Sequence, residues 1–154
     1  MTTHAITNAQ SVYETITAYW EAVDFLHYPT ADESDFAELS ADALEVLSDV
    51  AGIKCFDDIS RNDADTVEDA ASELALSVCV RSGWTAVGDA MEPEEFEILL
   101  TTGGPGCRIV GDLNGGEPCR AELQHQDWGT PWTRLPGQQC DALNWFAGLF
   151  YFGG

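Results

Sequence analysis

A cysteine, a histidine and an aspartate, the residue types of several hydrolase sites, lie close together near residue 120. Cys119, His125 and Asp127 occupy odd positions of the segment "CRAELQHQDW" (119–128), which alternates like a strand, so one face is expected to hold all three. A cysteine beside a histidine that an aspartate orients would be a nucleophile. However, side chains two positions apart on a strand stand about 6–7 Å apart and run parallel. We therefore favour a structural histidine, and a hydrolase remains the third hypothesis.

Metal chemistry is the second possibility in this region. Cys107, Cys119 and His125 are suitable ligands for zinc, but they lack the close pairwise spacing of structural zinc sites. The five cysteines are odd in number and form no C-x-x-C pair, so reduced thiols are expected. The sequence predicts neither a metal nor a cofactor.

Recognition by charge is the third possibility, because five acids in segment 32–51 are spaced three, four, three and four positions apart. On one helix they would form a continuous row about 80° wide, rising about 5 Å per acid, which is comparable with phosphate spacing along a nucleic-acid strand. Like charges at this spacing destabilise an isolated helix by roughly a few tenths of a kcal/mol per pair. The row and the acids of the following loop form the predicted partner-binding surface: Asp35, Glu38, Asp42, Glu45, Asp49, Asp57, Asp58, Asp63 and Asp65.

The glycine-rich stretch "TTGGPG" (101–106) could cradle a phosphate or turn a strand around. A P-loop requires G-x-x-x-x-G-K-[ST] before a helix, whereas Gly106 is followed by the strand-like "CRIVGDL" without a lysine. The stretch therefore predicts a hairpin turn.

Trp128 and Trp132 flank a proline-containing turn and are a possible second partner surface. The alternative, which we favour, is that both tryptophans cover one end of the sheet. The acids at Glu92, Glu94, Glu95 and Glu97, which flank Pro93 at the entry to a strand, are interpreted as solvated loop residues.

These residues require an α+β fold to position them. Apolar periodicity predicts N-terminal helices, an antiparallel meander of three to four strands and a C-terminal helix. The helices are expected at 8–27, with Asn8 as N-cap and a break at Pro29, at 32–51, at 63–73 and at 137–151. Strands are expected at 76–82, where a helix is the competing interpretation, and at 96–102, 107–113 and 119–128. Residues 1–154 are expected to form a single domain, with an acidic helical part (1–75) and a sheet part with the last helix (76–154).

Charge is the outstanding property of the composition, with 27 acidic residues, 6 basic residues and a net charge of −21. Residues 1–75 carry −15 of this charge and residues 76–154 carry −6. Such a chain is repelled by nucleic acids and anionic membranes and attracted to basic surfaces, which nucleic-acid-binding proteins present most extensively. The start of the sequence has neither a basic region nor an apolar run, so a cytoplasmic protein is expected.

The stretch "EILLTTGGPGCRIVGDL", followed by "LQHQDWGTPWT" and the aromatic ending "FAGLFYFGG", resembles small acidic accessory proteins of bacteriophages and mobile elements. The resemblance covers about residues 76–152 and brings no catalytic residue with it. It implies an accessory protein of the kind that includes inhibitors of CRISPR effectors and restriction enzymes.

The leading hypothesis is a DNA-mimic inhibitor that is not an enzyme and that occupies the basic nucleic-acid-binding surface of a host defence protein. A phage-encoded inhibitor would act in the cytoplasm of the host cell. The main alternative is haloadaptation, in which abundant acids and a single lysine, Lys54, reflect a salty environment and not a partner. The uneven distribution of charge along the chain favours the inhibitor.

Overall fold

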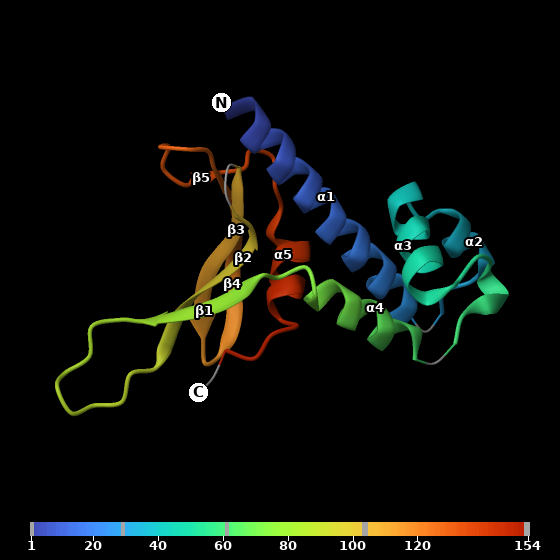
Figure 1. Cartoon of the computed structure of the whole chain (residues 1–154). Coiled ribbons are helices and arrows are strands. Elements are labelled where there is room, and N and C mark those ends of the chain that lie inside the picture. The colour runs from blue at the N-terminus through green and yellow to red at the C-terminus, as the bar shows by residue number, and fades with distance from the viewer. Residues whose placement is uncertain (1, 29, 61, 103–104, 153–154) are drawn as a thin grey trace. The chain divides into compact units, whose positions relative to one another are not determined.

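The computed structural model describes residues 2–28, 30–60, 62–102 and 105–152. The α+β prediction is confirmed: N-terminal helices are followed by an antiparallel strand meander and a C-terminal helix (Figure 1). The elements are α1 (Thr2–His27), α2 (Glu33–Ala37), α3 (Ala41–Ala51), a 3₁₀ turn η1 (Phe56–Asp58), α4 (Asp63–Ser72), β1 (Ser77–Ser82), β2 (Pro93–Thr101), β3 (Gly106–Asn114), β4 (Glu117–Gln126), β5 (Thr133–Arg134) and α5 (Cys140–Ala147).

The chain is organised in two compact units. One comprises Glu14–Leu74, and the other comprises Met1–Tyr13 together with Ala75–Gly154. We call them the helical unit and the sheet unit.

The first helix begins earlier than predicted. Asn8, the expected N-cap, lies inside α1, and its side-chain amide donates to Thr101 Oγ1 at 3.2 Å. No glycine or proline interrupts the segment before it, and Ala5 and Ala9 are buried one turn apart, which extends the apolar stripe toward the N-terminus. The helix ends at His27, close to the break expected at Pro29, which itself lies outside the described residues.

The single helix predicted over 32–51 is wrong, because the chain forms α2 and α3 there. Ser40 separates them: its Oγ accepts from the Ala43 amide at 3.1 Å and so caps α3. The same serine is bound to Glu21 of α1, since its amide and its hydroxyl donate to that carboxylate at 2.8 and 2.9 Å.

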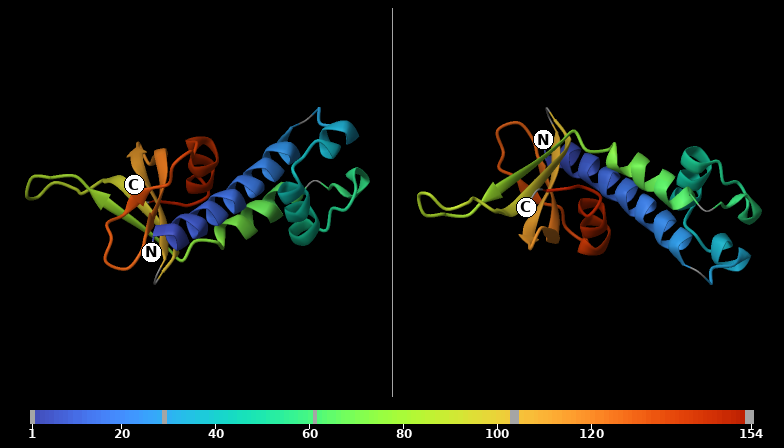
Figure 2. Two further views of the ribbon diagram at one scale, coloured as in Figure 1. Left: turned by 90° about the horizontal axis from the view of Figure 1, so that it is seen from above. Right: turned by 90° about the horizontal axis from the view of Figure 1, so that it is seen from below.

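The helix predicted over 63–73 is confirmed as α4, which lies alongside the second part of α1 in all three views (Figures 1 and 2). An apolar core joins the helices of this unit. Its fully buried members are Ile16, Val23, Leu47, Ile53 and Val67.

In the described residues, five strands form one antiparallel sheet in the order β1-β2-β3-β4-β5. The segment 76–82 is a strand, as predicted, and the two-residue strand β5 was not predicted because it is too short to show a period. Gly115 and Gly116 both adopt positive φ, at 62° and 88°, as a tight hairpin between β3 and β4 requires. The turn predicted at "TTGGPG" includes Gly103 and Gly104, which lie outside the described residues, and the flanking strands β2 and β3 pair antiparallel.

Helix α5 covers one face of the sheet and packs beside β4 (Figures 1 and 2). It is shorter than the predicted 137–151, so Phe150 follows the helix and does not belong to it. The core between α5 and the sheet contains fully buried aliphatic and aromatic side chains: Ile98, Ile109, Leu123, Leu135, Leu143 and Phe146.

The side chains of Gln138 and Asn144 form hydrogen bonds with the backbone of β4 on the side that faces away from β3. Asn144 Oδ1 accepts from the Ala121 amide at 2.9 Å. Gln138, which is buried, accepts from the Leu123 amide at 2.7 Å and donates to the Leu123 carbonyl at 2.8 Å. These two side-chain amides supply hydrogen bonds that a neighbouring strand would otherwise form, because β5 is too short to pair with this part of β4.

Candidate functional site

The face that was expected to hold Cys119, His125 and Asp127 is interrupted by a β-bulge. Between Val110 and Asp112 of β3 lies one residue, whereas the matching stretch of β4 contains two, and the first of them, Arg120, has φ of 51°. Because the bulge adds one residue, positions of the same parity before and after it no longer share a face.

The expectation that Cys119 and His125 share a face is therefore wrong. Cys119 pairs with Asp112 and His125 pairs with Cys107, and these two β3 positions lie five residues apart on a regular strand, on opposite faces. Asp127 follows the end of β4, where its Oδ1 accepts from the Trp128 amide at 2.8 Å. The geometric premise of a Cys-His-Asp nucleophile does not hold.

Cys107 is the thiol on the same side as His125, and both are buried. Burial raises the pKa of Cys107 to about 12, so the thiol is neutral at physiological pH and lacks the thiolate that a nucleophile needs. Within the described ranges, no group of three or more His, Cys, Asp or Glu side chains is placed to hold a metal ion.

The continuous row of five carboxylates is divided by the break at Ser40. Asp42, Glu45 and Asp49 are exposed on α3 and retain their helical spacing. Asp35 belongs to α2, where its carboxylate accepts from the Asp32 amide at 3.0 Å, and Glu38 is the C-cap of that helix. The row therefore consists of three acids on one helix and two on another.

The acids of the loop before α4 also differ in their environments. Asp63 is buried, and its carboxylate accepts from the Ser60 amide at 2.5 Å and from the Ser60 hydroxyl at 3.0 Å, so it exposes little surface to a partner and we do not assign it to the interface. Asp58 accepts from the amides of Lys54 and Cys55, and these hydrogen bonds lower its pKa below the ordinary value. Asp57 and Asp65 are exposed.

The helical unit as a whole is strongly negative. Its 61 residues contain 17 acids and two bases, Lys54 and Arg61, for a net charge of −15. Burial raises the pKa of Tyr19 in α1, and the neighbouring charges of Glu73 and Asp49 raise it further. Any cation near this unit meets a broad negative field.

In the sheet unit, acids and arginines form ion pairs between neighbouring strands, and the sequence did not predict these pairs. Each of its four arginines is paired with a carboxylate on a neighbouring strand: Arg81 with Glu95, Arg108 with Glu97 at 2.6 Å, Arg120 with Asp112 at 2.7 Å and Arg134 with Glu122 at 3.1 Å. The polar positions of adjacent strands carry this signal, but reading it requires the register, which the bulge shifts.

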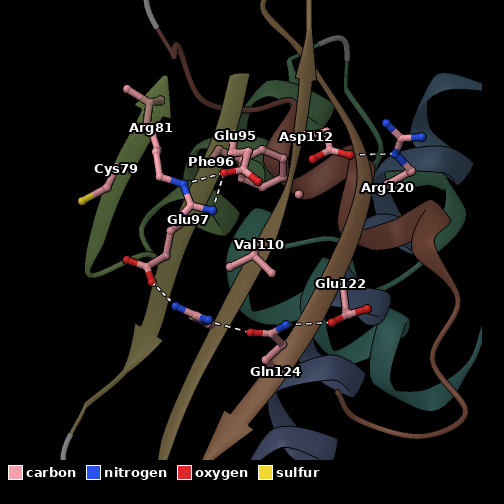
Figure 3. A pocket seen from close by; sticks show the side chains of 13 residues that line it. Cys79, Arg81, Glu95, Phe96, Glu97, Val110, Asp112, Arg120, Glu122 and Gln124 are labelled. Atoms are coloured by element: carbon pink, nitrogen blue, oxygen red, sulfur yellow. Dashed lines mark hydrogen bonds and ion pairs between the residues drawn. The ribbon is translucent and has the colours of Figure 1, made fainter. Parts of the chain in front are cut away.

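Three of these pairs, together with Glu122 of the fourth, line an open depression of about 510 Å³ on the sheet face opposite α5 (Figure 3). Gln124 links two of them, because its Oε1 accepts from Arg108 at 3.0 Å and its Nε2 donates to Glu122 at 2.7 Å. The opposed charges balance, so this face is close to neutral within a chain of net charge −21.

The predicted second surface, Trp128 and Trp132, divides into two roles. The Arg108 guanidinium carbon lies 4.3 Å from the centre of the Trp132 ring, so this tryptophan supports the charge network. Trp128 is exposed, which contradicts the interpretation that both rings cover the end of the sheet.

Comparison with known protein families, with curated proteins and with solved structures yields no match to this chain. Among the described residues, no helix is both long and apolar enough to cross a bilayer.

Proposed function

We propose that the helical unit is a docking surface for the basic, nucleic-acid-binding region of another protein, and that the chain inhibits this partner by excluding its nucleic acid. The observation that carries the proposal is the net charge of −15 on 61 residues. The sheet unit of the same chain pairs four of its ten acids with its four arginines, whereas the helical unit has two bases for 17 acids, so the excess of negative charge is concentrated in the helical unit. Haloadaptation acts on the whole surface and predicts no such division.

We assign five exposed acids to the interface. Three belong to α3, one to η1 and one to α4: Asp42, Glu45, Asp49, Asp57 and Asp65. Asp35 and Glu38 contribute to the same field from α2. The resemblance of residues 76–152 to phage accessory proteins favours a CRISPR effector or a restriction enzyme as the partner.

The test is a competition experiment with purified CRISPR effectors and restriction enzymes. Fluorescence anisotropy of a labelled DNA, or of a guide-bound target DNA, reports its displacement by this protein. We expect displacement by the wild-type chain at about 0.1 M salt and its steep loss at higher salt, because the contacts are between carboxylates and basic side chains.

A five-site variant, with Asp42, Asp49, Asp57 and Asp65 changed to Asn and Glu45 to Gln, should lose this displacement and keep its fold. The matched control changes five exposed acids of the sheet unit by the same total charge: Asp89, Glu92, Glu94, Glu117 and Asp141. Equal loss in both variants would mean that only net charge matters. Full displacement by the five-site variant would refute the proposed surface.

A further inference from the structure

The two edges of the sheet differ in how their backbone groups are covered. Beside β4, the short strand β5 and the side chains of Gln138 and Asn144 supply hydrogen-bond partners. β1 forms the other edge and pairs with β2 on one side, and within the described part of the chain no strand pairs with its other side. An uncovered edge strand is a template for pairing with another strand.

The β1 edge lies in the longest stretch of the sequence without an acidic residue. Residues 74–88 contain no acid and one base, Arg81, although acids occur about once in six residues over the whole chain. Large apolar side chains are exposed along this segment and in the loop that follows β1, which extends beyond the sheet in Figures 1 and 2: Leu76, Val80, Trp84, Val87 and Met91. An apolar edge without acids is suited to contact another protein.

We propose that this edge pairs with the β1 edge of a second copy of the chain, so that two five-stranded sheets join into one. Antiparallel pairing of identical strands is self-complementary under a two-fold axis. Charge favours this occupant, because β1 carries no acid, so two chains of net charge −21 can pair along it without placing acids opposite acids.

A register that opposes no like charges places Cys79 of both copies opposite each other. Val78 of each copy then faces Val80 of the other, and Ser77 faces Arg81, so no charge meets a like charge. A register shifted by one residue in either direction loses both valine pairs. Directly opposed residues in antiparallel strands have Cα atoms about 5 Å apart, so the two Cys79 side chains would be close neighbours.

Salt separates this inference from the proposed function, on which it does not depend. Net repulsion between two chains of charge −21 opposes dimerisation, and salt screens it, so the dimer should strengthen as salt increases. Binding to a basic partner should weaken under the same conditions.

The experiment is sedimentation equilibrium of the full chain from micromolar to millimolar concentration, at about 0.1 M and about 1 M salt. We expect a mass that rises from 16.7 kDa toward twice this value, at lower protein concentration in high salt. Val80→Lys should weaken the dimer by about tenfold or more, because a lysine would lie against the facing valine. This lysine reduces the net negative charge, so added repulsion between the chains would not explain the loss.

Two further measurements test the register and the specificity. With Cys55 and Cys140 changed to Ser, a short bismaleimide should link two chains through Cys79, and Cys79→Ser should abolish the link. Tyr151→Lys, at another exposed aromatic residue of the sheet unit, should leave the dimer unchanged. A monomer under all conditions would overturn the proposal, as would a dimer that neither responds to Val80→Lys nor links through Cys79.

Discussion

Cys107 is the residue whose environment differs most from that expected of a free thiol. Its neutral form is stable in the core, and its pKa rises from 9.0 to about 12. Because the folded pKa exceeds the unfolded one, the stabilisation is complete below pH 9 and is lost as the pH rises toward 12. Chemical denaturation between pH 8 and 11 should therefore show decreasing stability.

Cys107→Ala should flatten this alkaline decrease relative to the wild type, while leaving the decrease that comes from other groups such as Tyr19. Native alkylation at pH 8, followed by mass spectrometry, is the companion measurement: the exposed Cys55, Cys79 and Cys140 should react first and Cys107 only after unfolding. Rapid modification of Cys107 in the folded protein would contradict this assignment.

The environments of two single residues, Asp63 and Arg120, could not be predicted from the sequence. Asp63 looks like any other acid of an acidic loop, and only its two bonds from Ser60 identify it as structural. Arginine is not a residue type that predicts a positive φ, yet Arg120 has one. The bulge at this position places Cys119 on the opposite face of the sheet from His125. Local residue type does not determine either outcome, because both depend on neighbours that the fold supplies.

At the scale of elements, the break between α2 and α3 rests on one capping serine. Ser40→Ala removes the hydrogen bond to the Ala43 amide and both bonds to Glu21. The expected loss in the free energy of unfolding is about 1–2 kcal/mol, measured by urea denaturation. Ser34→Ala, within α2, is the control and should be neutral or slightly stabilising, since alanine favours a helix. Equal effects of the two changes would mean that Ser40 does not hold the break.

The order and type of the longer elements were predictable, because apolar residues recur at helical spacing in α1 and α4 and alternate in β2, β3 and β4. What failed was the continuity of 32–51, where the apolar stripe of Phe36, Leu39, Ala43 and Leu47 persists across the break. Periodicity records which positions face a core and is insensitive to a helix that ends and restarts in phase. The same limit hid the sheet-face network, since the pairing of Arg108 with Glu97 depends on register.

At the scale of the whole molecule, charge was the property that the sequence described best, because composition does not depend on the fold. The uneven distribution of charge along the sequence corresponds to the two units of the structure. The helical unit has few bases to balance its acids, and the sheet unit pairs its arginines with carboxylates. A protein adapted to high salt needs salt to screen its acids and stay folded, whereas an acidic protein adapted to a basic partner must fold without added salt. Hydrophobic cores exist in both units, so folding should not require screening.

Thermal unfolding followed by circular dichroism at about 0.01 M and about 1 M salt distinguishes the two explanations. We expect a cooperative transition at both, with a higher melting temperature in high salt, because screening weakens repulsion among the 17 acids of the helical unit. The five-site variant of the helical unit should gain stability at low salt, whereas its sheet-unit control should gain less, since the repulsion is concentrated in the helical unit. A chain that is unfolded at low salt and folds only when salt is added would favour haloadaptation. The acids would then serve the solvent environment, and the competition for a basic partner would lose its physical basis.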